Sequence, residues 1–198
     1  MNISHVGSGA IRRIMIVGGP GSGKSYLSRR LAEVSGLPVF HMDHIHWLPG
    51  WVARDPVEKD MLTREIHDRD HWIFEGGHSR TYADRAARAD LLIWLDLPVW
   101  LRIRRVLWRS VRHHGRTRPD LPSGCPEVLG RETIDFLRFI WRSRETSRQS
   151  VQRAIDRGRP ALRVERLTRP AEVRDFLRSC HPATDLPGLL PGIGAGKL

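Results

Sequence analysis

The chain has 198 residues, enough for one domain with a full hydrophobic core and too few for two, so we expect a single domain over residues 1–180. Its 40% hydrophobic and 28% charged residues exclude a disordered chain, and its longest apolar run, at 91–95, excludes a membrane-spanning helix. Two cysteines exclude a disulfide framework, and residues 1–13 lack the apolar segment of a secretory signal. We therefore expect a cytoplasmic protein without a membrane partner.

The net charge of +11 comes almost entirely from arginine. Lys and Arg together number 33 against 22 Asp and Glu, and only Lys24, Lys59 and Lys197 are lysines. The planar donor group of arginine suits phosphate, so nucleotides and nucleic acids are both candidate partners. The same excess also fits a genome of biased base composition, in which case it carries no functional information.

Short apolar strands alternate with amphipathic helices along the chain. We predict strands at residues 13–19, 37–43, 71–77, 89–98 and 160–167, a helix from 24 to about 34 that stops at Gly36, and a closing helix over 170–180. This alternation predicts a parallel sheet covered on both faces, with ligands beyond the carboxyl ends of the strands. Residues 181–198, rich in Pro and Gly, are predicted to form a flexible tail.

The sequence GGPGSGKS at residues 18–25 joins the first predicted strand to the first predicted helix. It has the spacing of a phosphate-binding loop, in which glycines allow successive backbone N–H groups to point at one anion. The positive end of the following helix adds to this attraction. Lys24 is expected to reach the outer phosphates, and the Ser25 hydroxyl to coordinate magnesium. We assign nucleotide binding to Gly18, Gly19, Gly21, Ser22, Gly23, Lys24, Ser25 and Tyr26.

Three carboxylates, Asp43, Glu75 and Asp96, are expected at the ends of predicted strands. A carboxylate there can hold a magnesium-bound water or accept the proton of an attacking hydroxyl. We assign these roles to Asp43 and Glu75, with Glu75 as the candidate metal ligand beside Ser25, and leave open which of the two serves the acceptor. For Asp96 we favour a pair with one of the many arginines.

The sequence HMDHIHW at residues 41–47 places three histidines around Asp43. Zinc is one interpretation, but the spacing matches no closed zinc pattern, so we favour acceptor binding. Trp47 and Trp51 either stack on a base or cover the core.

A row of arginines follows the fourth predicted strand. Arg102, Arg105, Arg109 and Arg112 recur at spacings of three, four and three, which predicts one helix face, with Val99, Ile103, Val106 and Leu107 opposite. Such a row can neutralise charge during phosphoryl transfer or form a solvated helix face. The loop at 115–127 either closes over a nucleotide or forms an ordinary connection, and Pro126 suits the first turn of the next helix. We assign catalysis to Lys24, Asp43, Arg105, Arg109, Arg116 and Arg118.

The motifs GGPGSGKS, MDHIHW, FEGGHSRTY, LIWLDLP and GRTRPDLPSGCPE together resemble the adenylate-kinase-like P-loop NTPase family known as DNA topology modulation proteins, over about residues 13–180. The resemblance implies a P-loop NTPase three-layer α/β sandwich with a five-stranded parallel sheet, a helical lid at about 109–131, ATP, Mg²⁺ and a bacterial cytoplasm. Relatives carry Asp-Gly-Asn-Tyr-Ser after the third strand, where this chain has EGGHS from Glu75. Glu75 can still hold a magnesium-bound water, whereas His78 changes the acceptor contacts.

We therefore predict an ATP-dependent, magnesium-dependent kinase for a small-molecule or nucleotide acceptor that the sequence does not identify. The alternative is a nucleic-acid-binding P-loop ATPase or regulator that affects DNA topology, which the charge and the family name support. It predicts strongly salt-dependent DNA binding. No recognition helix or aromatic RNA platform is evident, so nucleic acid is not favoured. A nucleotide-binding scaffold without turnover disagrees with the intact Lys24 and Ser25.

Overall fold

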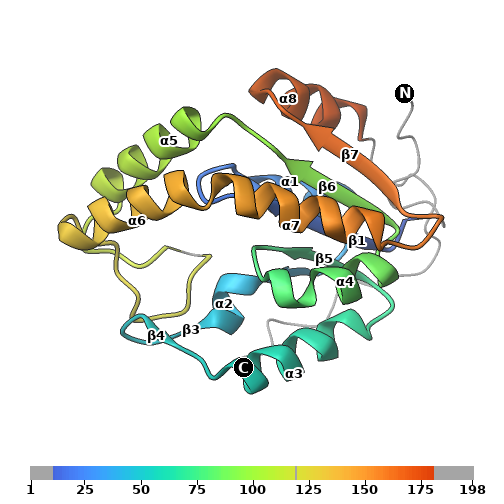
Figure 1. Cartoon of the computed structure of the whole chain (residues 1–198), viewed down its shortest axis with the longest axis horizontal. Helices are drawn as coiled ribbons and strands as arrows, with labels where there is room; N and C mark the ends of the chain where they lie inside the picture. The colour runs from blue at the N-terminus through green and yellow to red at the C-terminus, as the bar shows by residue number, and fades with distance from the viewer. Residues whose placement is uncertain (1–10, 119, 181–198) are drawn as a thin grey trace.

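The computed structural model describes residues 11–118 and 120–180 and is built on one parallel sheet (Figure 1). The five strands run in the order β2-β5-β1-β6-β7. Their bounds are Val39–His41 for β2, Trp72–Glu75 for β5, Arg13–Gly18 for β1, Leu91–Leu95 for β6 and Arg163–Leu167 for β7. The prediction of a five-stranded parallel sheet is confirmed, and β7, the strand with the weakest apolar pattern, lies at an edge.

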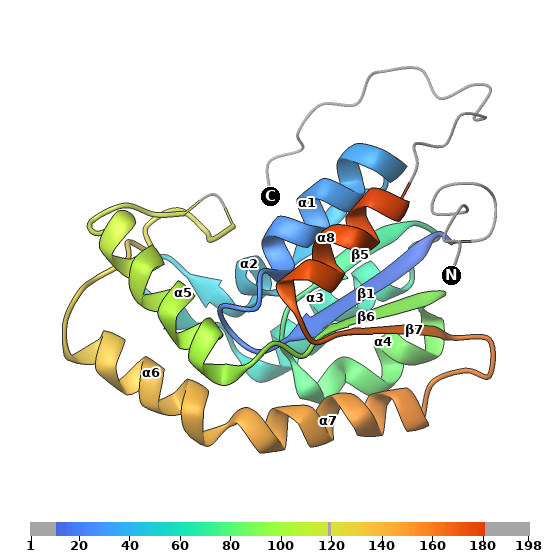
Figure 2. The same ribbon diagram turned by 90° about the horizontal axis from the view of Figure 1, so that it is seen from above.

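The central strands are buried on both faces, which explains their continuous apolar sequences. In β1, Ile14 and Ile16 belong to one core cluster, whereas Met15 and Val17 belong to the other. Two helices cover the first face, α1 (Lys24–Ser35) and α8 (Pro170–Ser179), and three cover the second, α3 (Pro56–His67), α4 (Tyr82–Arg88) and α7 (Arg144–Asp156) (Figure 2). The molecule therefore has the predicted three layers.

The first helix ends as the sequence predicts. Gly36 has φ 70°, a left-handed conformation that glycine adopts at little cost, and its N–H donates to the carbonyl of Ala32 at 2.8 Å. At the other end of α1, the glycine loop leads directly from β1 into Lys24. The carboxyl edge of the sheet and the N-terminus of α1 consequently face the same side of the molecule.

Several elements extend from this edge of the sheet. They are α2 (Met42–His46), the short hairpin of β3 (Trp47–Leu48) and β4 (Val52–Ala53), the 3₁₀ turn η1 (Ser79–Thr81), α5 (Val99–Arg112) and α6 (Arg131–Arg142). Residues 113–130 join α5 to α6. We call them the lid segment after the lid predicted at about 109–131, and closure over a ligand stays a prediction. No helix in the described part of the chain is both long enough and apolar enough to cross a bilayer.

Two sequence predictions about this region are wrong in detail. The strand predicted over 37–43 ends at His41, so Asp43 lies in the first turn of α2 and not at a strand end. Pro126 is not in a helical turn, because it forms a β-bridge with Thr117 and the next helix begins at Arg131. That helix is interrupted at Ser143, which separates α6 from α7. The tail predicted at 181–198 lies outside the described residues.

A buried polar network joins α3 to α4 beneath the sheet. Arg85 is fully buried, lies over the ring of Phe74 and donates to the carbonyl of Gly76 at 3.2 Å. Its Nε also donates to Nε2 of His67 at 3.3 Å, so that nitrogen accepts and Nδ1 of His67 donates to Asp84 at 2.6 Å. Both ring nitrogens are used by the neutral form, and a second ring proton would oppose the Arg85 donor. Burial and Arg85 therefore lower the pKa of His67 to about 4, despite Asp84.

We predict that this histidine makes stability depend on pH between about 6.5 and 4. The unfolded chain binds the proton at the ordinary histidine pKa and the folded chain only near 4, so the free energy of unfolding falls as the pH decreases through this window. The loss approaches about 3 kcal/mol. When the free energy of unfolding is measured with urea at several pH values in this range, its dependence on pH should be weaker in His67→Gln. The Gln amide can make both hydrogen bonds without titrating. Equal slopes in the two proteins would contradict the prediction.

Candidate active site

The glycine loop at 18–25 curls at the carboxyl end of β1. Gly18, Gly21 and Gly23 have φ angles of 151°, 77° and 96°, in the region that side chains with a Cβ rarely adopt. The N–H of Ser22 donates to the carbonyl of Gly19 at 3.2 Å, which closes the turn. The loop thus has the strand, glycine turn and helix arrangement of a phosphate-binding site.

Helix α5 packs so closely on this loop that a side chain would not fit. A Cβ on Gly19 would overlap the guanidinium of Arg102, and a Cβ on Gly21 would overlap the carbonyl oxygen of the same residue. At Gly18 a Cβ would come within 2.6 Å of the carbonyl oxygen of Leu95. Gly18 and Gly21 are therefore required by packing against backbone as well as by their φ angles, whereas the atoms next to Gly19 belong to the flexible Arg102 side chain.

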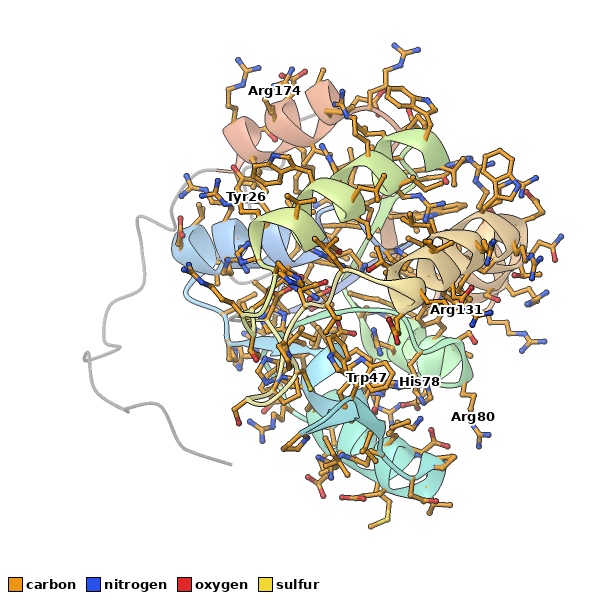
Figure 3. All side chains as sticks on the ribbon, turned by 90° about the vertical axis from the view of Figure 1, so that its left-hand side faces the viewer. Tyr26, Trp47, His78, Arg80, Arg131 and Arg174 are labelled. Atoms are coloured by element: carbon orange, nitrogen blue, oxygen red, sulfur yellow. The ribbon has the colours of Figure 1, made fainter. Side chains whose placement is uncertain are left out.

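The polar residues of the loop point in different directions. Nζ of Lys24 donates to the carbonyl of Gly19 at 3.3 Å, and Oγ of Ser25 donates to Oε1 of Glu75 at 2.9 Å. Tyr26, labelled on α1 in Figure 3, is 55% exposed, and its assignment to nucleotide binding stays a prediction. Ser25 is thus brought to the predicted carboxylate Glu75.

Glu75 ends β5, as the sequence predicts, and is buried. Besides Ser25, it contacts His41, whose Nδ1 lies 2.7 Å from Oε1. Burial alone would raise the pKa of Glu75, but the His41 hydrogen bond and the charge of Lys24 outweigh it and lower the pKa. Glu75 is therefore held as a carboxylate beside the Ser25 hydroxyl.

Asp43 has the opposite electrostatic environment, although it belongs to the same cluster. Burial and the nearby charge of Glu75 raise its pKa, and these effects exceed those of Lys24 and Arg118. Two neighbouring carboxylates with pKa values shifted apart are suited to different roles, one as a fixed anion and one as a group that exchanges a proton. The two carboxylates therefore differ in electrostatic environment, and which of them serves the acceptor stays a prediction.

The arginine row of α5 only partly meets the site. NH1 of Arg105 donates to the carbonyl of Ser22 at 3.2 Å, and Arg102 is buried against Gly19. Arg112 instead is exposed and lies over the ring of Trp108 at 5.1 Å. Val106, predicted opposite the arginines, is buried on the glycine loop, because it lies one turn after Arg102. The prediction that Leu107 lies on the other face is confirmed, and that face is exposed.

The lid segment contributes a compact group of charges. Oε1 of Glu127 lies 2.7 Å from Nε of Arg118 and 3.3 Å from Nε of Arg109, while NH1 of Arg118 donates to Asp120 at 2.7 Å. Burial and the adjacent Arg118 lower the pKa of Arg109, against the effect of Glu127. Two arginines that share one carboxylate form a site in which a phosphate group would be stabilised. Arg116 is exposed, and among the described residues no side-chain hydrogen bond or ion pair joins it to this group.

The lid segment also contacts the β3–β4 hairpin. Nε1 of Trp51 donates to the carbonyl of Pro126 at 2.9 Å, and the N–H of Gly50 donates to the carbonyl of Gly124 at 2.8 Å. Sγ of Cys125 donates to the carbonyl of Leu48 at 3.4 Å. Trp51 therefore serves packing and hydrogen bonding in this structure, and it holds the left-handed φ of 60° that is uncommon outside glycine.

His78, the residue at which this chain departs from the resembled family, contacts helix α3. Nε2 of His78 lies 2.9 Å from Oδ1 of Asp60, and Arg80 contacts the other oxygen of Asp60 at 3.1 Å.

Asp96 pairs with Arg148 at 2.8 Å and with Arg166 at 2.5 Å, so the structural role that the sequence favoured for it is confirmed.

The residues present fit a nucleoside triphosphate with magnesium. The hydroxyl of Ser22 and Nε of Arg102 are buried at the glycine loop without a hydrogen-bond partner, so polar groups there await an acceptor. Among the described residues, no group of three or more His, Cys, Asp and Glu side chains is arranged to hold a metal ion. A magnesium ion bound with phosphate takes most of its ligands from phosphate oxygens and water, so Ser25 and Glu75 suffice on the protein side.

Sequence reasoning missed four residues of this site: His41, Arg102, Asp120 and Glu127. Arg102 belongs to the arginine row, but its proximity to Gly19 depends on how α5 crosses the loop. His41 was visible only as one of several histidines. Asp120 and Glu127 lie in the 115–127 loop, and nothing local shows that they pair with arginines of that loop and of α5.

Comparison with known proteins identifies the fold. No protein-family model and no curated protein matches the sequence. Among solved structures, shikimate kinase from Bacteroides thetaiotaomicron superposes with a TM-score of 0.55 and 14% identity, covering 85% of this chain and 96% of that one. Shikimate kinase from Acinetobacter baumannii, in complex with shikimate, superposes with a TM-score of 0.50 and 17% identity, covering 85% of this chain and 89% of that one. The resemblance to DNA topology modulation proteins finds no support here, and the chain has the P-loop kinase-like fold.

Proposed function

We propose that this chain is an ATP- and magnesium-dependent phosphotransferase that acts on a small-molecule or nucleotide acceptor. The observation that carries the proposal is the Ser25–Glu75 hydrogen bond at the mouth of the glycine loop, with Lys24 and Asp43 in the same cluster. Arginines from α5 and the lid segment complete this edge of the sheet. Phosphoryl transfer needs a loop that binds phosphate, a carboxylate that helps to hold the metal ion, a base, and cations that balance the phosphate charge.

The residues divide between donor and acceptor. The glycine loop and Lys24 would bind the ATP phosphates, and Ser25 and Glu75 would hold Mg²⁺, which neutralises phosphate charge when bound. Arg105, Arg109 and Arg118 would stabilise the charge that develops on the transferred group. Cytoplasmic ATP and magnesium would supply the site.

Asp43 would serve the acceptor. As the acceptor oxygen bonds to the γ-phosphorus and the bond to the β–γ bridging oxygen breaks, Asp43 takes the hydroxyl proton and ADP leaves. A carboxylate whose pKa is raised by burial is a stronger base than one fully solvated. The histidines of α2 and the β3–β4 hairpin follow Asp43 directly in the chain, so we assign the acceptor to this side. One fold neighbour is described in complex with shikimate, a hydroxy acid, which makes hydroxy acids a class to test beside nucleoside monophosphates.

The proposed function first predicts acceptor-dependent turnover. ADP release from Mg-ATP should depend on one member of an acceptor panel that contains nucleoside monophosphates, hydroxy acids and duplex DNA. Lys24→Ala should lower this rate at least about 100-fold, because it removes a cation that contacts the outer phosphates. Arg29→Ala, an exposed arginine on the same helix, should keep the wild-type rate. Stimulation by DNA alone, or by no acceptor, would overturn the kinase assignment.

The second prediction separates the two carboxylates. Asp43→Asn should lower kcat about 100-fold or more while leaving the Kd for ATP nearly unchanged, because it removes the base and not the cradle. Glu75→Gln should instead raise the magnesium concentration needed for half-maximal rate. Steady-state kinetics with magnesium titrations distinguish these effects. Equal magnesium dependence in the two variants would show that the roles are assigned wrongly.

A further inference from the structure

The outer surface of α5 and α6 carries large apolar side chains in solvent. Figure 3 shows these two helices side by side on the face turned to the viewer. Six side chains that are 42% to 63% exposed define what we call the α5–α6 face: Trp100, Leu107, Trp108, Val111, Ile134 and Trp141. On α5 the spacing of 100, 107 and 111 forms one stripe, opposite the side of the helix that packs on the glycine loop. Helix α5 is therefore used on both sides.

A shallow apolar groove continues this face between the two helices. It has a volume of about 300 Å³ and is lined by Ile103, Ile134, Leu137 and Trp141, with Arg138 and Arg142 beside them. Several exposed apolar side chains on neighbouring helices, bordered by cations, are typical of an interaction site and not of an ordinary solvated helix.

The charges around this face have one dominant sign. Helix α5 contains five arginines and no acidic residue. Guanidinium groups of Arg104, Arg112 and Arg144 lie over the rings of Trp100, Trp108 and Trp141 at 6.0, 5.1 and 4.4 Å. On α6, Asp135 is paired with Arg138 at 2.9 Å. A partner that covers this face must therefore be both apolar and anionic.

We propose that the α5–α6 face docks on the surface of an anionic phospholipid bilayer. Leu107, Val111 and Ile134 can enter the boundary of the acyl chains, and tryptophan rings prefer the headgroup level. The surrounding arginines would contact lipid phosphates. The sequence expectation of no membrane partner rested on the lack of a spanning helix, and an interfacial contact needs only an amphipathic face.

Two other occupants fit the face less well. Single-stranded nucleic acid binds by stacking bases on aromatic rings, but half of the six side chains are aliphatic and each of the three rings has an arginine over one side. A second copy of this chain would bring two arginine-rich α5 helices together without acidic residues on either. The observed composition and charge favour the lipid surface.

The test is vesicle co-sedimentation of the full chain, which needs no nucleotide and is independent of the proposed function. Binding to phosphatidylcholine vesicles that contain phosphatidylglycerol should exceed binding to pure phosphatidylcholine vesicles, and brominated acyl chains should quench tryptophan fluorescence. The double variant Trp100→Ser/Leu107→Ser should lower partitioning at least about tenfold. The matched control is Val57→Ser/Met61→Ser on α3, where the side chains are 66% and 60% exposed. Circular dichroism verifies that both variants fold.

Each other outcome overturns the proposal. Equal binding to neutral and anionic vesicles would remove the role of charge, and an unchanged double variant would place the contact elsewhere. If the wild-type chain bound single-stranded DNA and did not bind vesicles, the face would be assigned to nucleic acid. A dimer in light scattering that becomes monomeric in Trp100→Ser/Leu107→Ser, without vesicle binding by wild type, would assign it to a second copy.

Discussion

The contact between helix α5 and the glycine loop organises the molecule. It exists because Gly19 and Gly21 have no Cβ, so that Arg102 and the backbone beside it can occupy that space. This contact sets the direction of α5, and therefore the positions of Arg105 and Arg109 along it. It also leaves the opposite side of the same helix in solvent. The surface that packs on the glycine loop and the surface that faces solvent are thus two sides of one helix.

The positive charges of the site are partly balanced by carboxylates, which lie next to cations that could also bind phosphate oxygens. Glu127 and Asp120 pair with Arg118, and Glu127 also pairs with Arg109. The charge of Lys24 favours the ionised forms of Glu75 and Asp43. Arg109 and Arg118 therefore have carboxylate partners that a phosphate group could replace with little change in net pairing. This balance explains how so many arginines are buried or half-buried at one edge of a sheet.

The sequence predicts the fold well because the fold depends on local patterns. The apolar strands, the glycine loop and the end of α1 at Gly36 follow from periodicity and backbone preference, and all are present. Asp43 was placed wrongly because helix α2 begins directly after His41, a boundary that no glycine or proline marks. The partnership of Glu127 with Arg109 and Arg118 was not predictable, because it depends on the path of the lid segment. Residue chemistry is local, whereas ion pairing is set by tertiary structure.

The hydrogen bonds from the hairpin to the lid segment have a consequence for cooperativity between substrates. Trp51, Gly50 and Cys125 join the β3–β4 hairpin, which the proposed function assigns to the acceptor, to the segment that carries Arg118. If the two move as one body, an acceptor that settles the hairpin also settles the arginines around the nucleotide. Thermodynamic reciprocity then requires each substrate to raise the affinity for the other by the same factor. Hydrolysis of ATP without an acceptor would be suppressed by the same linkage, because the arginines would be ordered fully only when both substrates are bound.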